Sequence, residues 1–352
     1  IFAAFNLHRH ALYACLIALA SVGFTACESD ENGEYGEEKI PEGALPTTEF
    51  TPGNFEDEPY AEDAIKVEVQ GTLEGNPEFS SIELFGDGHY LMSGANYNHA
   101  PQKTVKAKRE ADGSVSVFKK RGTKRMATRA NEDGTIIFDN GSYTYGTYTR
   151  EQKGVYRFNN GALLDLRKLK EGSSTVVYTN SNGVKSTVYV NYAETENTDW
   201  TGSLCRAWRM NSFETWHYLN GAYIAHGKQW ITNGVVSHNI DLSPAAQKWD
   251  YDKEDVLDED SEFCYRVIFS TNNTYICFYM DHTAEVAKWE WTNPYNGVLH
   301  YWDPWDPDNS DWEGDTTVRF KGKQMRIYED YSESEDGFSF RMICVNTLTA
   351  GY

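Results

Sequence analysis

The stretch Tyr265–Met280, YRVIFSTNNTYICFYM, decides the fold class. Two runs of apolar and aromatic residues, Tyr265–Phe269 and Thr274–Met280, flank the polar segment Ser270–Asn273. β-branched and aromatic residues favour strands, and a short segment of Ser, Thr and Asn between two such runs favours a turn. The stretch therefore predicts an antiparallel β-hairpin.

Similar hairpins recur along the chain, and no long helical pattern lies between them. The clearest pairs are Ile82–Phe85 with Tyr90–Met92, Lys106–Glu110 with Val115–Phe118, Val155–Phe158 with Leu163–Leu166, and Ser174–Tyr178 with Thr187–Asn191. One short helix is expected at Asn211–Leu219, where the aromatic residues do not alternate cleanly. Hairpins at this spacing predict an all-β protein made of antiparallel sandwiches or barrels.

The strands fall into two halves that repeat one theme: a strand, a polar turn and a Tyr-bearing return strand. A chain of 352 residues has room for two domains, so we expect β domains at 63–195 and 196–352 in tandem. The segment 27–62 is rich in Glu, Pro, Gly and Thr, which predicts a flexible acidic tether. The acidic stretch Trp249–Glu262 is expected to be a solvated loop.

Residues 1–26 have the pattern of an export signal. Arg9 and its neighbouring histidines precede a short apolar run, as in a secretory signal peptide, and the run is shorter than a membrane span. The sequence FTAC at 24–27 resembles a lipobox, in which the cysteine thiol carries a diacylglycerol anchor. The sequence ESDE at 28–31 resembles the acidic tag of Bacteroidetes lipoproteins that reach the outer leaflet of the outer membrane. We therefore expect lipid attachment at Cys27 and display at the cell surface.

The chain is acidic and rich in aromatic residues. Its formal net charge is −21 at pH 7, and Phe, Trp and Tyr make up 14% of the residues. Such a negative charge repels nucleic acid and anionic lipid, so neither class is expected as a partner.

Four cysteines lie in the C-terminal half: Cys205, Cys264, Cys277 and Cys344. An even number in an exported chain allows two disulfides. Cys264 and Cys277 flank the hairpin turn, and Cys205 and Cys344 lie near the two ends of the half, but spacing does not choose among the pairings. The alternative is four buried free thiols that pack as small apolar groups.

From Trp200 to the C-terminus the chain resembles the lipocalin-like domains of Bacteroidetes lipoproteins. The resemblance rests on the Trp-Thr-Gly sequence at 200–202, the hairpin at 268–280, AKWEW at 287–291 and VRFKGKQMRIYEDY at 318–331. It implies an up-and-down antiparallel barrel or half-barrel in this half.

A Trp-rich loop is the candidate ligand site. Trp302, Trp305 and Trp312 share this loop with Asp303 and further aspartates. Indole rings stack on the apolar face of a sugar and carboxylates accept hydroxyl hydrogen bonds, so the loop is a candidate glycan site. The alternative is that the rings cover the open end of a barrel, because buried aromatic residues are the commoner use.

The same loop offers oxygen ligands to a hard cation. Asp306, Asp308 and Ser310 stand at alternate positions, as Ca²⁺ ligands often do. The sequence thus allows calcium and indicates no other cofactor. The alternative is that these acids are simply solvated.

A basic island stands out against the acidic background. It consists of Lys103, Lys106, Lys108, Arg109, Lys119, Lys120, Arg121, Lys124, Arg125 and Arg129. Alternate residues of a hairpin share a face, so part of this set forms one patch that fits an anionic glycan or an acidic partner protein. The alternative is a charged strand face that discourages edge-to-edge association.

Catalytic motifs are absent from the sequence: it contains no Gly-x-Ser-x-Gly, no His-Glu-x-x-His and no phosphate loop. We expect a binding protein without enzymatic activity, anchored in the outer membrane, that captures a glycan or a small amphiphile. The alternative is a structural lipoprotein that meets a partner protein and has a filled barrel.

Overall fold

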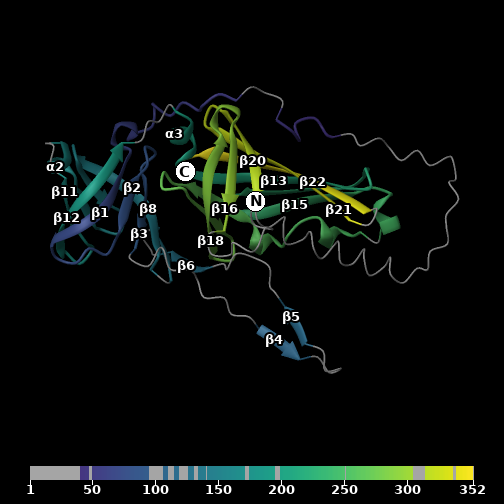
Figure 1. The fold of residues 1–352 in the computed structure, drawn as a ribbon, viewed down its shortest axis with the longest axis horizontal. Helices are drawn as coiled ribbons and strands as arrows, with labels where there is room; N and C mark the ends of the chain where they lie inside the picture. The colour runs from purple at the N-terminus through teal and green to yellow at the C-terminus, as the bar shows by residue number, and fades with distance from the viewer. Residues whose placement is uncertain are drawn as a thin grey trace.

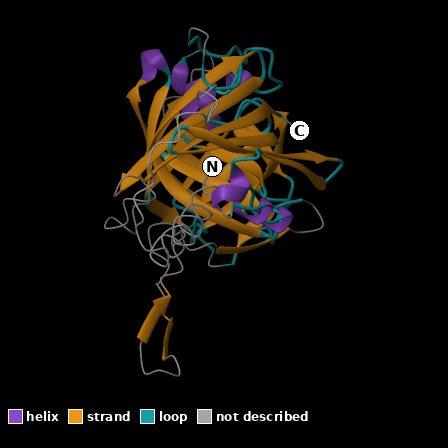
Figure 2. Cartoon of the chain, turned by 90° about the vertical axis from the view of Figure 1, so that its right-hand side faces the viewer, coloured by secondary structure: helices purple, strands orange, loops and turns teal. Residues whose placement is uncertain are grey.

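The computed structural model describes residues 40–46, 50–94, 106–109, 115–118, 126–130, 134–139, 141–170, 174–194, 199–249, 251–303, 314–335 and 338–351. This part of the chain is nearly all β (Figure 1 and Figure 2). It contains two closed antiparallel eight-stranded barrels. The predicted fold class is confirmed. No helix within these ranges is long and apolar enough to cross a membrane.

The N-terminal barrel is a meander whose last strand pairs with its first. Its strands are β1 (Ile65–Glu74), β2 (Ser81–Leu84), β3 (His89–Ser93), β8 (Tyr143–Gln152), β9 (Val155–Phe158), β10 (Leu163–Asp165), β11 (Thr175–Thr179) and β12 (Lys185–Glu194). Each strand pairs with the next, and β12 closes the barrel against β1. Alternate residues point inward, where Tyr90, Tyr156 and Val188 belong to one buried cluster.

The C-terminal barrel closes in the same way around a second core. Its strands are β13 (Ala207–Leu219), β16 (Cys264–Phe269), β17 (Thr274–Tyr279), β18 (Thr283–Asn293), β19 (Val298–Trp302), β20 (Gly314–Lys321), β21 (Gln324–Glu335) and β22 (Phe338–Ala350). The β16–β17 hairpin is the one predicted, and β22 closes the barrel against β13. Trp208, Tyr275, Tyr279 and Trp289 fill the interior.

Short elements connect the strands. They include α2 (Arg167–Lys170), α3 (Trp200–Leu204) and η5 (Pro294–Asn296), and η1 (Ala61–Asp63) precedes β1. The predicted basic hairpin is formed by β4 (Lys106–Arg109) and β5 (Val115–Phe118), which make a separate two-stranded sheet. β12 and α3 lie on either side of the predicted domain boundary near residue 195.

β13, β21 and β22 continue beyond the second barrel. There β14 (Ala222–Thr232) pairs with β13, and β15 (Val235–Leu242) pairs with β14. The result is a five-stranded sheet in the order β15-β14-β13-β22-β21, here called the extension. The helix expected at Asn211–Leu219 is wrong, because this segment is strand.

Two Asn-Gly turns explain why these residues form strands. Asn220 and Gly221 have φ values of 48° and 77°, and Asn233 and Gly234 have 51° and 76°. Positive φ at both central residues is what a type I′ hairpin turn requires, and Asn-Gly adopts it readily. Each turn therefore sends the chain straight back as a neighbouring strand.

A buried apolar layer, here called the fusion layer, joins the two barrels. Phe138 and Tyr145, which both belong to the N-terminal sheet, pack on Phe278 of the second barrel, with ring centroids 5.9 Å apart in each pair. The layer also contains Phe85, Leu91, Ile136, Tyr143, Ala207, Ile268, Ile276, Ala284 and Val286. Two further strands lie between β3 and β8 in the chain, namely β6 (Met126–Ala130) and β7 (Ile136–Phe138). β7 pairs with β8, β6 pairs with β7, and β6 also pairs with β18, so hydrogen bonding continues from the first sheet to the second.

Part of the predicted tether is packed rather than flexible. Phe55 is buried against Trp208, and the Arg206 guanidinium lies 3.3 Å from the centre of the Phe55 ring. Arg206 also forms a buried ion pair with Glu58. Residues 40–46 cross the outer face of the extension and bury Ala44 there. Single aromatic residues in a polar segment give no periodic signal, so composition alone does not predict this packing.

The acidic stretch covers the other face of the extension instead of standing in solvent. It carries η2 (Ala246–Trp249), η3 (Lys253–Asp255) and η4 (Asp260–Glu262), and its Tyr251, Val256 and Leu257 are buried. A Cβ atom at Gly227 would lie 2.7 Å from Val256 and 2.8 Å from Leu257. Glycine at this position of β14 therefore lets the loop approach the sheet.

A chain of buried hydrogen bonds ties this loop to the sheet. The Tyr251 hydroxyl donates to Asp255 O at 3.0 Å, so it accepts from His217 Nδ1–H. His217 Nε2 then accepts from the Thr215 hydroxyl at 2.9 Å, and that hydroxyl accepts from the Cys344 thiol at 3.6 Å. This order assigns His217 the neutral Nδ1–H tautomer. Glu329 lies opposite Cys344 on β21, and burial raises its pKa to about 7.

The fusion layer predicts a large loss of stability in Phe278→Ala. Phe278 is almost fully buried between the barrels, and removing a core Phe costs about 3–5 kcal/mol. Urea unfolding should show a loss of that size, whereas Tyr295→Ala at a position 78% exposed should change the free energy of unfolding by about 0.5 kcal/mol or less. A loss below about 1 kcal/mol in Phe278→Ala would mean that the layer does not form.

Glu329 predicts a pH dependence of stability. Folding raises the pKa of Glu329 from 4.5 to about 7. The stabilising contribution of Glu329 to the free energy of unfolding is therefore fully present below pH 4.5 and is lost as pH rises through 7. Glu329→Gln removes this loss, which amounts to about 3 kcal/mol at most. Urea unfolding at pH 5 and pH 8 should show wild type weakening relative to the variant, and the exposed control Glu290→Gln should follow wild type. Parallel behaviour of wild type and Glu329→Gln would contradict the assignment.

Candidate functional site

The predicted Trp-rich loop lies only partly within the described residues. Trp302 ends β19, and its half-buried ring stacks on His300 with centroids 5.8 Å apart. Asp303 follows and is buried. Outside the described residues lie Trp305, Trp312, the calcium candidates Asp306, Asp308 and Ser310, and the anchor candidate Cys27. The glycan and calcium predictions for this loop stay predictions. Among the residues that are described, no group of three or more His, Cys, Asp or Glu side chains is arranged to hold a metal ion.

The four cysteines are free and buried in the structure. Cys205 belongs to the core of the second barrel, and Cys344 lies under the acidic loop, in a separate cluster. Cys264 and Cys277 lie on paired strands, and their thiols share a hydrogen bond. The structure thus corresponds to the alternative of buried thiols, and a Cys264–Cys277 disulfide stays a prediction.

Burial raises the pKa of three of the four thiols, whereas at Cys264 burial is outweighed by the hydrogen bond with Cys277 together with weaker interactions, and the pKa is lowered. Burial raises the pKa of Cys344 to about 12, so the thiolate is scarce at neutral pH, although the thiolate is the nucleophilic form. Cys205 and Cys277 have pKa values raised by burial as well. In the hydrogen-bonded chain the Thr215 hydroxyl lies between the Cys344 thiol and His217 Nε2.

The interior of the second barrel is occupied by its own side chains. Trp208 Nε1 donates to Leu204 O at 2.8 Å, and Trp289 Nε1 donates to Ser270 O at 3.2 Å. The Trp289 ring packs edge-on against Phe269 with centroids 5.9 Å apart. A ligand-holding calyx would need the space that these rings take. The arrangement favours the filled-barrel alternative and leaves the outer surface as the place for a candidate site.

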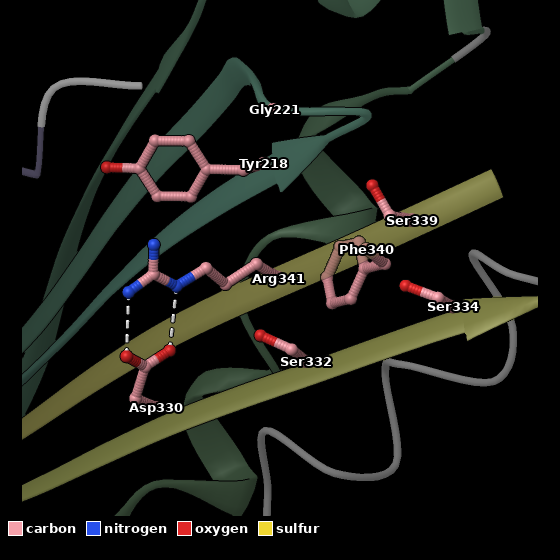
Figure 3. Close-up of a pocket in the computed structure, with 8 residues that line it drawn as sticks. All are labelled: Tyr218, Gly221, Asp330, Ser332, Ser334, Ser339, Phe340 and Arg341. Atoms are coloured by element: carbon pink, nitrogen blue, oxygen red, sulfur yellow. Dashed lines mark hydrogen bonds and ion pairs between the residues drawn. The ribbon is translucent and has the colours of Figure 1, made fainter.

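A cleft of about 460 Å³ opens at the end of the extension, where the β13–β14 turn lies (Figure 3). Its lining consists of Tyr218, Gly221, Asp330, Ser332, Ser334, Ser339, Phe340 and Arg341. Hydroxyl and charged groups dominate this set. The cleft is therefore suited to a polar ligand rather than to an apolar one.

Strand register brings the lining residues together. Residues two apart on β21 point to the same face, which places Asp330, Ser332 and Ser334 in one line. Ser332 lies opposite Arg341 on β22, and Arg341 lies opposite Tyr218 on β13. One cross-strand row therefore presents a hydroxyl, a guanidinium and a phenol side by side.

The Asn220-Gly221 turn positions the next cross-strand row of the cleft. Ser334 lies opposite Ser339, and Ser339 N donates to Asn220 Oδ1 at 2.7 Å. Asn220 N in turn donates to Ser339 O at 2.8 Å. The Asn-Gly turn thus fixes the end of β22 and with it the serine at the cleft.

A charged pair forms the most defined part of the cleft. Arg341 Nε and Nη2 donate to the two carboxylate oxygens of Asp330 at 2.8 Å and 2.7 Å. The third guanidinium nitrogen points away from Asp330 (Figure 3). Both side chains are partly exposed, so the pair adds little to stability, but Asp330 holds the planar guanidinium in a fixed orientation for hydrogen bonding.

Residues 40–46, here called the strap, border the cleft. Ile40, Ala44 and Leu45 pack on an apolar cluster of the outer face that includes Trp216 and Tyr218. Tyr218 also lines the cleft. The strap therefore covers the apolar part of this face and leaves the polar part open.

The sequence alone did not predict this site. Its residues are common polar types, and none forms a recognisable motif. Two signals were present: the alternation of Asp330, Ser332 and Ser334, and the Asn220-Gly221 turn. Neither reveals the cleft without the β13–β22–β21 register.

The comparisons with known proteins leave the family open. No protein-family model matches the chain, and no curated protein matches it. A solved structure from Bacteroides fragilis, provisionally described as an outer membrane protein, matches 82% of this chain and 98% of its own at 7% identity. The TM-score is 0.23, and a likeness this weak carries no argument about fold or function.

Proposed function

We propose that this protein is a lipid-anchored cell-surface binding protein that captures a glycan in the cleft of the extension. The observation that supports it is the lining of the cleft, where three serines and the Arg341–Asp330 pair lie together. Sugar hydroxyls both donate and accept hydrogen bonds. Serine hydroxyls do the same, a carboxylate accepts, and a guanidinium donates.

The polarity of the cleft favours a glycan over a small amphiphile. Phe340 and Tyr218 contribute the apolar part of the lining, and both are almost fully buried. An amphiphile would gain little from such a surface, because the hydrophobic contribution scales with the apolar area removed from water. A sugar exchanges water hydrogen bonds for protein hydrogen bonds and needs no large apolar wall.

The proposed activity is binding without catalysis. Hydrolysis of a glycosidic bond commonly uses two carboxyl groups that flank the bond. Asp330 is the one carboxylate among the residues that line the cleft, and it is already paired with Arg341. A glycan held there would be bound, oriented and released unchanged.

The location follows from the N-terminal sequence. The lipobox-like sequence ending at Cys27 and the acidic residues after it support an outer-membrane anchor that faces the cell exterior. Because the strap begins at residue 40, at most about 45 Å of extended chain separates it from an anchor at Cys27. The cleft beside the strap would then work close to the membrane surface.

Arg341→Ala tests the proposed site. A glycan array should identify a bound oligosaccharide, and calorimetric titration of Arg341→Ala should show affinity weaker by at least about tenfold, or about 1.4 kcal/mol. Arg341→Lys should lose most of the affinity too, because an ammonium group cannot replace the several N–H donors of the planar guanidinium. Arg157→Ala, which removes another exposed Arg–carboxylate pair on the first barrel, is the matched control. Unchanged affinity in Arg341→Ala would remove the cleft as the site.

Cys27→Ala tests the anchor. The substitution removes the thiol that would carry the lipid, so the protein should leave the lipid-modified outer-membrane fraction and accumulate as uncleaved precursor or soluble chain. Metabolic labelling with a radioactive fatty acid and membrane fractionation measure this. Ser29→Ala is the control, since it keeps the cysteine. Labelled Cys27→Ala protein in the outer membrane would contradict the prediction.

A further inference from the structure

The extension ends in an unguarded edge strand. β15 is eight residues long, none of them is buried, and among the described strands it pairs only with β14. Val235 is 64% exposed and Leu242 is 36% exposed. Natural edge strands are usually short or carry Lys, Pro or a bulge, which prevents pairing with another chain. β15 contains no Lys and no Pro, and no described strand pairs with its outer row of backbone donors and acceptors.

The basic hairpin is a pair of strands that could join such an edge. β4 and β5 pair with each other and with no other described strand, and Figure 1 and Figure 2 both show them projecting from the body. An isolated two-stranded hairpin is marginally stable in water and gains stability by joining a larger sheet. Residues 103–129 contain ten basic and two acidic residues, a net charge of +8 in a chain of −21.

The surroundings of β15 are acidic. Residues 250–262 contain eight acidic residues and one lysine, a net charge of −7. This loop lies beside the edge strand, since His238 Nδ1 of β15 is 3.1 Å from Asp260 Oδ1. Glu254 and Glu259 of the loop are exposed. A basic strand that reaches β15 would therefore meet opposite charge along its side.

We propose that the β4–β5 hairpin of a second copy of this chain adds to the edge of β15. A four-residue strand spans about 13 Å and fits within the roughly 26 Å of β15. Exchange of hairpins between two copies would satisfy both edges in a closed dimer. Direct pairing of two β15 strands is less favourable, because it would bring two acidic loops together. The surface is separate from the glycan cleft, so the two proposals stand or fall independently.

Sedimentation velocity of the full chain in detergent tests the proposal. Wild type should form dimers that dissociate between about 0.05 M and about 1 M salt, because salt screens exposed charges. Val235→Lys combined with Asn239→Lys should raise the dimer dissociation constant at least about tenfold, because edge lysines block strand addition. The matched control is Leu73→Lys with Val184→Lys, two positions of similar exposure on the first barrel, and it should dimerise like wild type.

Exchanging the charges of the hairpin and the acidic loop tests whether these two surfaces contact each other in the dimer. Lys106→Glu with Lys108→Glu should weaken dimerisation at least about tenfold, and so should Glu254→Lys with Glu259→Lys. Mixing the hairpin variant with the loop variant, or combining all four changes, should restore affinity to within about threefold of wild type. Far-UV circular dichroism identical to wild type shows that each variant is folded. A wild-type monomer at every concentration, dimers that persist in both single-surface variants, or failure of the exchange to restore dimers would each overturn the proposal.

Discussion

Each barrel closes around its own side chains, and this constraint determines where the protein can bind anything. In the second barrel Trp208 and Trp289 occupy the interior and direct their indole N–H groups to backbone carbonyls. In the first, Tyr90 stacks on Phe158 with centroids 4.1 Å apart. Interiors packed in this way resist the insertion of a ligand, because displaced side chains would lose many contacts at once. Recognition is then left to the surface.

In the proposed function, the extension supplies that surface without a separate domain. β13, β21 and β22 run from the barrel wall into the extension without interruption, so the cleft at its end is fixed to the core by continuous strands. The strap and the acidic loop cover the two apolar faces of the extension. Among the described residues, the polar cleft, the edge of β15 and the edge of β21 beyond Tyr328 lie outside these two covers. The fusion layer binds the first barrel to this assembly through Phe278 and the β6–β18 pairing.

The local sequence pattern predicted the hairpins correctly. It failed where contacts between residues far apart in the sequence determine the structure. Tyr265–Met280 formed the predicted hairpin because strand-favouring residues and turn residues agree within a short segment. Asn211–Leu219 was assigned to the wrong class because both faces of β13 are covered, one by the strap and one by the acidic loop, which removes the alternation. Phe55 and Leu257 show the same limit, since each sits in a polar segment and is buried only by residues far away in sequence. The cleft could not be predicted, because it depends on the register that places Ser332, Arg341 and Tyr218 in one row.

The most direct test of filled barrels with an external site is a nuclear magnetic resonance titration with the oligosaccharide that the protein binds best. The side-chain N–H signals of Trp208, Trp289 and Arg341 report on the interior and on the cleft in one spectrum. Binding at the cleft should shift the Arg341 Nε–H signal and leave the two indole signals in place and slow to exchange with solvent. Shifts at Trp208 and Trp289, with Arg341 unchanged, would show that the barrel holds the ligand and would contradict the account.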